Sequence, residues 1–242
     1  MTWCGRRLIA LGLLVVCLPG CIRAAAVAAQ QDDNSPVVQH IDAAVRARLD
    51  NTLGYTVTEH YAVFRNSDLD HPTAEMTVKT TYRKDTGKSY EILSKSGSEV
   101  IQRLVLSVIL DNEKRINLPG NREGSWITSA NYEMKLKPGG AQQLDGRDCF
   151  VLDISPRRKA PNLLEGTLWV DEKDGSIVEI QGTASASPSV FTGPTRMMRH
   201  YANVNGYAMA THARAVSNSF LFGQTVVTID YRDYQVELRP SK

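Results

Sequence analysis

The sequence predicts a mainly β fold with some α-helix, in which one strongly curved antiparallel sheet has helices on its inner side. Three observations predict it. About eleven short β-rich segments follow one another with turn residues between them, two segments show helical periodicity, and the apolar positions of the last strand change parity partway along. Short strands joined by tight turns favour an antiparallel sheet, and a parity change indicates a β-bulge that bends it.

The hairpin at 166–182 is the clearest single element. The β-rich runs 167–171 and 176–180 flank Asp174-Gly175, a pair that tolerates the positive backbone angles of a tight turn. Alternation along the first run places Leu168 and Val170 on one face and Trp169 on the other. We therefore expect one face of this sheet to be buried.

The N-terminus has the layout of a secretory signal peptide. Arg6 and Arg7 precede an apolar run at 8–18, which is too short to span a bilayer, and small residues fill 24–29. Cleavage near Ala29 would leave 30–242 as a single domain in the periplasm. The alternative is a lipoprotein anchored through Cys21, because 18–21 (Leu-Pro-Gly-Cys) is similar to a lipobox.

Charge and cysteine content narrow the possible partners. Three of the 28 basic residues would be removed with a signal peptide cut after Ala29. The mature chain would then have 25 basic and 26 acidic residues, so its net charge would be close to zero. With no basic stripe among aromatics, nucleic acid is not an expected partner. Cys149 is the one cysteine of the four outside the signal region, and on a predicted strand it is a small core residue rather than a nucleophile.

Two segments are predicted to be helices. Residues 36–49 carry apolar side chains at helical spacing after Pro36, which suits the first helical position. Residues 98–116 have a wider apolar side that includes Leu104, Val105, Val108 and Ile109. A helix with so wide an apolar side has to be covered, so we place it on the concave side of the sheet.

The remaining elements are predicted strands. They occupy 55–64, 75–84, 88–93, 132–136, 149–154, 196–204, 207–218 and 225–238, with a hairpin turn at 85–87. Residues 125–128 are expected to begin a return segment, and 184–194 to form a long irregular loop. In the last strand the parity changes near Arg232-Asp233, which predicts the bulge.

No catalytic, metal or cofactor motif emerges from the sequence. The five histidines have no metal-ligand spacing, and 87–89 (Gly-Lys-Ser) lacks the first glycine of a phosphate-binding loop and lies on a hairpin. No nucleophile elbow is present. We therefore expect no catalytic residue, no metal and no cofactor.

The C-terminal half resembles the LolA-like outer-membrane lipoprotein-sorting superfamily. The resemblance is carried by LDGRDCFVLDISP from Leu144, GTLWVDEKDGSIVEIQG from Gly166, RHYANVNGYAMATHARAV from Arg199 and VTIDYRDYQV from Val227. Ala210 stands where members often have proline. The resemblance implies an incomplete β-barrel wrapped over helices, with an apolar cavity for acyl chains and no enzymatic activity.

Taken together, the leading hypothesis is a non-catalytic envelope protein that binds the acyl chains of a lipoprotein or lipid. Its partners would be those chains, an envelope protein as a second partner, and a membrane touched peripherally or transiently. The alternatives are an envelope sensor or interaction module, which the similar half-barrel of an anti-sigma regulator family suggests, and a hydrolase with a cryptic site. The residues expected to line the cavity are Leu104, Val105, Val108, Ile109, Leu168, Val170, Phe191 and Met197.

Overall fold

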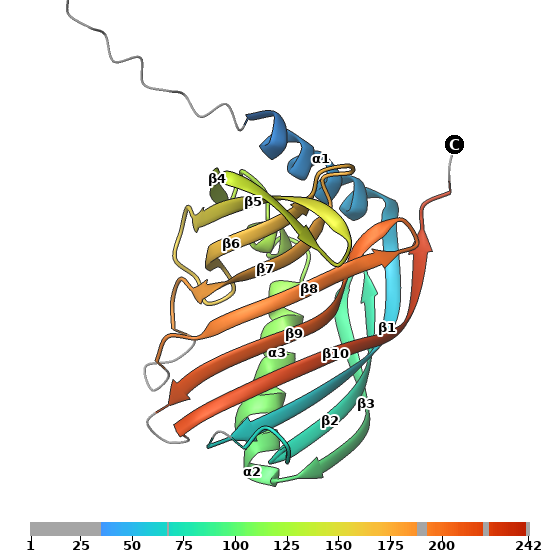
Figure 1. Cartoon of the computed structure of the whole chain (residues 1–242). Helices are drawn as coiled ribbons and strands as arrows, with labels where there is room; N and C mark the ends of the chain where they lie inside the picture. Colours follow the sequence, from blue (N-terminus) through green and yellow to red (C-terminus); the bar gives the residue numbers. More distant parts are fainter. Residues whose placement is uncertain (1–34, 67, 188–192, 220–222, 241–242) are drawn as a thin grey trace, which may run out of the picture. The chain divides into compact units, whose positions relative to one another are not determined.

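The computed structural model describes residues 35–66, 68–187, 193–219 and 223–240. Their ten strands form one antiparallel sheet with the order β3-β2-β1-β10-β9-β8-β7-β6-β5-β4. The sheet is strongly curved and has two free edges, β3 and β4, so it does not close into a barrel (Figure 1). The predicted curved antiparallel sheet and incomplete barrel are confirmed.

The strands fall on the predicted segments, although β4 continues to Leu144, eight residues beyond the predicted 132–136. Their bounds are β1 Thr52–Arg65, β2 Ala74–Arg83, β3 Gly87–Gly97, β4 Tyr132–Leu144, β5 Arg147–Pro156, β6 Leu164–Asp171, β7 Ile177–Ala184, β8 Arg196–Val204, β9 Tyr207–Ser219 and β10 Gly223–Leu238. Residues 125–128 differ from the prediction. Ser125 ends a short 3-10 helix, η2 (Arg122–Ser125), and 126–128 belong to none of these strands.

The two predicted hairpins form as expected. β6 pairs with β7, β2 pairs with β3, and their turns contain Gly175 at φ +70° and Gly87 at φ +88°. Both glycines also lie against other backbone, since a Cβ on Gly175 would come within 2.7 Å of the His40 carbonyl oxygen. Glycine is therefore required there by backbone angle and by space.

The predicted bulge is present in β10. Pairing with β1 is interrupted between Thr56 and Thr58, opposite Arg232 and Gln235, and Asp233 has φ 58°. Residues before the bulge (Val227) and after it (Val236) thereby face the same side of a bent strand. This bend contributes to the curvature that the parity change predicted.

Helix α1 (Ser35–Asn51) closes one end of the inner face of the sheet (Figure 1). Ile41 and Val45 are buried against strands β4 to β8. We call this packing unit the first cluster. Its buried members are Ile41, Val45, Tyr132, Met134, Leu152, Ile154, Ala160, Leu163, Leu164, Leu168, Val170, Ile177, Ile180 and Tyr201.

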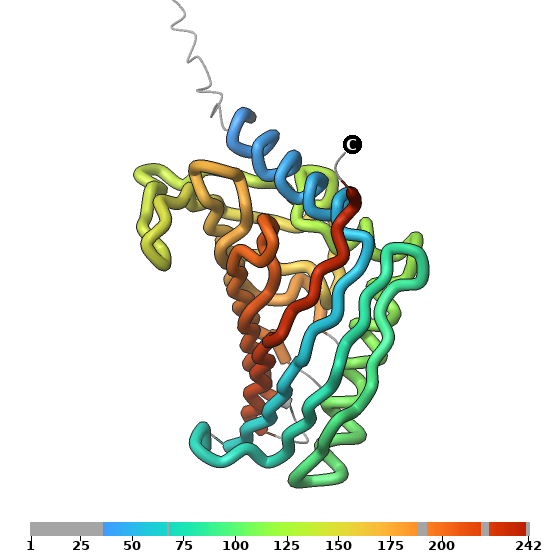
Figure 2. Tube along the Cα trace, turned by 90° about the vertical axis from the view of Figure 1, so that its right-hand side faces the viewer, coloured from blue at the N-terminus to red at the C-terminus, as the bar shows by residue number. Residues whose placement is uncertain are grey.

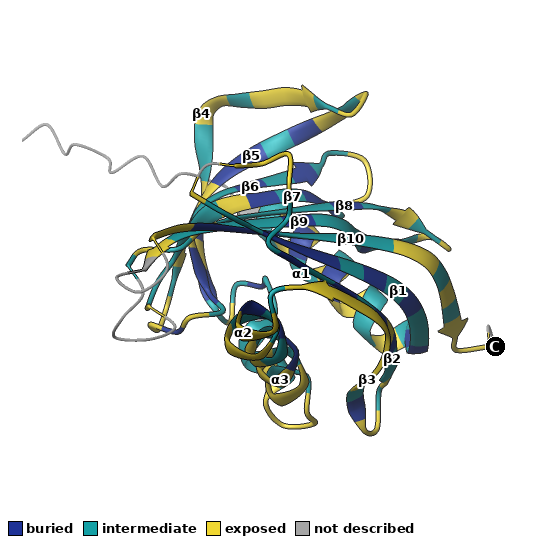
Figure 3. Cartoon of the chain, turned by 90° about the horizontal axis from the view of Figure 1, so that it is seen from below, coloured by how far each residue is buried: buried dark blue, intermediate teal, exposed yellow. Residues whose placement is uncertain are grey.

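The second helical segment lies under the arch of the sheet, as predicted (Figure 3). It runs through α2 (Glu99–Ile101), a π-helical turn η1 (Gln102–Leu106) and α3 (Ser107–Ile116), beside β2 and β3 (Figure 2). It packs in a separate second cluster, whose buried members are Tyr61, Val63, Ala74, Met76, Val78, Ile101, Leu106, Leu110 and Val227.

The π turn decides which side of this helix is buried. The Ser107 N–H bonds to the Gln102 carbonyl, five residues back, so the turn holds one residue more than an α-helical turn. Ile101 is consequently followed on the buried side by Leu106 and then Leu110. In an unbroken α-helix Val105 would have stood where Leu106 stands.

Candidate functional site

The structure divides the residues predicted to line a cavity among different environments. Leu168 and Val170 are fully buried in the first cluster, and Met197 packs against it. Val105 and Ile109 are partly buried against the second cluster. Phe191 lies outside the described residues. These side chains therefore do not meet around a single space.

Leu104 and Val108 occupy a third environment, and here the expectation of a fully covered helix was wrong. Each is 48% exposed, as is Val100, and the three follow one another at four-residue intervals. Ile101, Leu106 and Leu110 are the residues of this helix that are buried against the sheet, so the three exposed residues lie on the side that the sheet does not cover. We call Val100, Leu104 and Val108 the apolar ridge.

The edge strand next to this helix is also apolar and exposed. On β3, Ile92 is 47% and Leu93 52% exposed. Leu93 is left out of the pairing with β2, because Val78 pairs with Ile92 and Thr77 with Ser94. Together with the ridge, these residues make up most of the large exposed hydrophobic side chains in the described part of the chain. Such a gathering is typical of an interaction or ligand surface.

Charged side chains lie on the inner face where the two clusters adjoin. Glu113 of α3, one turn beyond Leu110, accepts a hydrogen bond from Lys88 of β3 at 2.9 Å. Its other carboxylate oxygen lies 4.0 Å from Arg199 of β8. Glu59 of β1 is 2% exposed and accepts a short hydrogen bond from the Tyr61 hydroxyl. We call Glu59, Lys88, Glu113 and Arg199 the charged cluster.

The charged forms of Glu113, Lys88 and Arg199 stabilise one another. Burial alone would raise the pKa of Glu113, but the positive charges of Lys88 and Arg199, with hydrogen bonds from Lys88 and Asn117, lower it from 4.5 to about 2. Burial would lower the pKa of Lys88, yet the Glu113 carboxylate raises it well above its ordinary value. Lys88 and Glu113 therefore form an ion pair that ties α3 to the sheet.

Two hydroxyl groups nearby are buried without a hydrogen-bond partner. They belong to Tyr90 of β3 and Thr80 of β2, which are paired across the two strands. Burial raises the pKa of Tyr90, whereas the neighbouring Lys88 opposes this. Unpaired buried hydroxyls are costly, so this part of the inner face has polar groups to satisfy.

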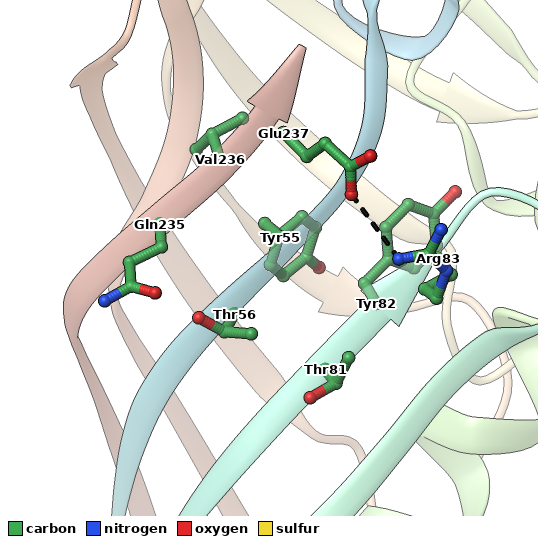
Figure 4. A pocket seen from close by; sticks show the side chains of 8 residues that line it. All are labelled: Tyr55, Thr56, Thr81, Tyr82, Arg83, Gln235, Val236 and Glu237. Atoms are coloured by element: carbon green, nitrogen blue, oxygen red, sulfur yellow. Dashed lines mark hydrogen bonds and ion pairs between the residues drawn. The ribbon is translucent and has the colours of Figure 1, made fainter.

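Two pockets lie elsewhere on the described part of the molecule. One, of about 260 Å³, opens on β1, β2 and β10 and is lined by Tyr55, Thr56, Thr81, Tyr82, Arg83, Gln235, Val236 and Glu237 (Figure 4). An ion pair between Arg83 and Glu237 at 3.4 Å crosses it. Another, of about 150 Å³, lies beside α1. Neither contains a residue of the predicted cavity.

The described residues offer little for other chemistry. Cys149 is buried, as predicted, and burial raises the pKa of its thiol, so its reactive thiolate form is disfavoured. No group of three His, Cys, Asp or Glu side chains in this part of the molecule is arranged to hold a metal ion. None of its helices has the length and hydropathy that a membrane-spanning helix needs.

Sequence reasoning missed the charged cluster. Lys88 was noted only as part of a turn, and Arg199 and Glu113 had no assigned role. Strand parity contained a usable signal for Arg199, since it shares the parity of Met197 and Tyr201, which pack against or within the first cluster. Nothing in the sequence indicated that Lys88 and Glu113 would meet.

Comparison with known proteins finds similar chains among solved structures. No family model and no curated protein matches the sequence. Among solved structures, a LolA superfamily protein from Nitrosomonas europaea aligns with 14% identity and a TM-score of 0.42, covering 85% of this chain and 94% of that one. A DUF1329 family protein from Desulfovibrio piger aligns with 13% identity and a TM-score of 0.42, covering 85% and 95%.

A third structure, a Vibrio parahaemolyticus domain assigned as an outer membrane lipoprotein-sorting protein, aligns with 14% identity and a TM-score of 0.46, covering 84% and 94%. At these identities and TM-scores the likeness assigns no role to any residue here.

Proposed function

We propose that this protein is a non-catalytic carrier of the cell envelope that binds the acyl chains of a lipoprotein or lipid. The observation that carries the proposal is the apolar ridge, three side chains in line on the helix under the arch, each 48% exposed. A half-exposed Leu or Val still has apolar area to bury, and each methylene that leaves water contributes about 0.8 kcal/mol. The acyl chain would lie along this helix rather than in the enclosed space expected from the sequence.

The partly buried side of the same helix supports this position. Val105 and Ile109 lie between the ridge and the sheet, so apolar surface continues from the exposed ridge to the inner face. The first cluster offers no comparable surface, because Leu168 and Val170 are 0% exposed. Cleavage near Ala29 and a periplasmic location belong to the same proposal, since a carrier of acyl chains would work between envelope membranes.

Binding of a fluorophore-labelled palmitoyl amide to the purified protein tests the proposal. Replacing Leu104 and Val108 together with serine should weaken binding about tenfold, because each loses apolar area that the chain would cover. The matched control is Leu69→Ser in the loop between β1 and β2, where the side chain is 52% exposed and far from the helix in sequence. The control should bind the probe as the unmodified protein does.

Two results would count against the proposal. Unchanged binding by the Leu104→Ser/Val108→Ser protein would remove the ridge as the site. No probe binding by the unmodified protein would remove the carrier function itself.

The ridge also favours a second function, an envelope sensor or interaction module, because an exposed apolar surface can equally receive a protein. The two functions separate in the same experiment. A sensor would lose a co-purifying envelope protein on Leu104→Ser/Val108→Ser substitution and would show no saturable binding of the palmitoyl probe.

A further inference from the structure

The charged cluster contains a gap between two polar groups that face each other. Glu113 Oε2 accepts hydrogen bonds from Lys88 at 2.9 Å and from Asn117 at 3.4 Å. Glu113 Oε1, in contrast, lies 4.0 Å from the nearest Arg199 nitrogen, beyond hydrogen-bond length. The two groups attract each other across this distance without touching.

The guanidinium of Arg199 has donors to spare on its side of the gap. It carries five N–H donors, and among the described residues it interacts with Tyr231, with Tyr201, whose hydroxyl oxygen accepts a hydrogen bond, and with the distant Glu113. The Arg199 side chain is 33% exposed and that of Glu113 is 22% exposed, so a group from outside can reach them. The gap thus presents an acceptor on the helix and donors on the sheet.

The charges of the cluster already balance. Glu59 and Glu113 offset Lys88 and Arg199, so the cluster is neutral when all four are ionised. A free carboxylate or phosphate that entered would leave one negative charge uncompensated in a largely buried place, which is costly. A neutral group that both accepts and donates would satisfy Arg199 and Glu113 without changing the balance.

The gap lies on the partly buried side of the helix, beside the apolar ridge. Val105, Ile109 and Glu113 follow one another at four-residue intervals and so share one side of the helix, and Val105 and Ile109 are partly buried against the second cluster. Glu113 is five residues beyond Val108, about 7.5 Å along the helix axis and about 140° around it, so it does not continue the line of the ridge. A chain that crosses from Val108 over Ile109 can place its polar end near Arg199 and Glu113.

We propose that the gap between Arg199 and Glu113 selects acyl ligands whose polar end is a neutral donor-acceptor group, such as an amide or hydroxy ester, over free fatty acids. This inference rests on the proposed acyl-binding function and names the ligand class. The ligand carbonyl accepts from the Arg199 guanidinium, and its N–H or O–H donates to Glu113 Oε1.

Two probes with the same chain and fluorophore test it, one ending in a primary amide and the other in a carboxylate. At pH 8 the unmodified protein should bind the amide at least tenfold more tightly. Glu113→Gln makes the cluster positive and supplies an amide donor, so the carboxylate probe should then bind as tightly as the amide probe or more tightly. Adding Lys88→Met to Glu113→Gln restores neutrality and should restore the preference for the amide.

Arg199→Gln provides an independent arm that keeps the Lys88–Glu113 pair, should Glu113→Gln fail to fold. This variant should bind the amide probe more weakly than the unmodified protein does. Its affinity for the carboxylate probe should fall further still, so the ratio of the two affinities should increase. The control is Arg214→Gln. Arg214 follows the inward-facing Ala213 in β9, so its side chain points to the outer face of the sheet. This substitution should leave the ratio of amide to carboxylate affinity unchanged.

The outcomes separate the two proposals. Binding of neither probe by the unmodified protein overturns the carrier function and this inference with it. Equal binding of both probes, or tighter binding of the carboxylate, overturns the inference and leaves the carrier function standing. A ratio that none of the cluster variants changes also overturns the inference.

Discussion

The two hydrophobic clusters lie on the same face of the same sheet, yet one is closed and the other is open. In the first cluster Ile41 of α1 and Leu168 and Val170 of β6 are 0% exposed. In the second, Leu106 is equally buried, but Leu104 and Val108 of the same helix are about half exposed. The difference arises because α2, η1 and α3 carry apolar residues on the buried side and also on the opposite side, and the sheet covers only one.

This difference suggests a division of labour. Apolar residues that the fold buries completely contribute to stability, whereas those left exposed lower solubility unless something binds them. The charged cluster adds to the contrast, since it fastens the open region by an ion pair where the closed region uses apolar packing. The predictions below test whether stability and binding are separated in this way.

The largest expected effect is on the first cluster. Leu168→Ala should lower the free energy of unfolding by about 2–5 kcal/mol, because it removes a fully buried side chain and leaves a cavity. Urea denaturation followed by circular dichroism measures it. A loss below about 1 kcal/mol would mean that the space around Leu168 is not closely packed and would remove the contrast between the clusters.

A smaller loss is expected in the charged cluster. Lys88→Met should cost about 2–3 kcal/mol, at or below the lower end for a broken buried ion pair, because Glu113 is still 22% exposed and keeps Arg199 nearby. The double variant Lys88→Met/Glu113→Leu should recover part of the loss by restoring an apolar contact. If the double variant is no more stable than Lys88→Met, the pair does not fasten the helix as described.

The charged cluster also predicts a dependence on pH. The pKa of Glu113 is about 2 in the folded protein and ordinarily 4.5, so its contribution is complete above about pH 4.5 and is lost as pH falls toward 2. Unfolding free energies measured between pH 5 and pH 2.5 should fall less steeply for Glu113→Gln than for the unmodified protein. Equal slopes would show that Glu113 is not held by Lys88 and Arg199.

The smallest effect on stability is expected at the ridge. Leu104→Ser should change the free energy of unfolding by less than about 1 kcal/mol, since the side chain is already 48% exposed. The same variant should be more soluble, which turbidity at high concentration measures. A loss like that of Leu168→Ala would mean that Leu104 is covered in solution, as the sequence alone had suggested.

The sequence by itself determined the local elements. Strand alternation, the Asp-Gly turns, the parity change near Arg232-Asp233 and the apolar periodicity of 36–49 and 98–116 all correspond to observed strands, turns, bulge and helices. These features depend on neighbours a few residues apart, so their pattern is visible in the chain. The inward direction of Leu168 and Val170 followed from the same alternation.

Tertiary structure alone decided how the helix at 98–116 meets the sheet. Periodicity showed that the apolar side of this helix is wide, but it did not show which part the sheet would cover. The π turn places Leu106 rather than Val105 next to Ile101 on the buried side. This turn follows from the packing of the helix against β2 and β3. The pairing of Lys88 with Glu113 depends likewise on a contact between residues 25 positions apart. Such contacts are set by the curvature of the whole sheet, which no short stretch of sequence encodes.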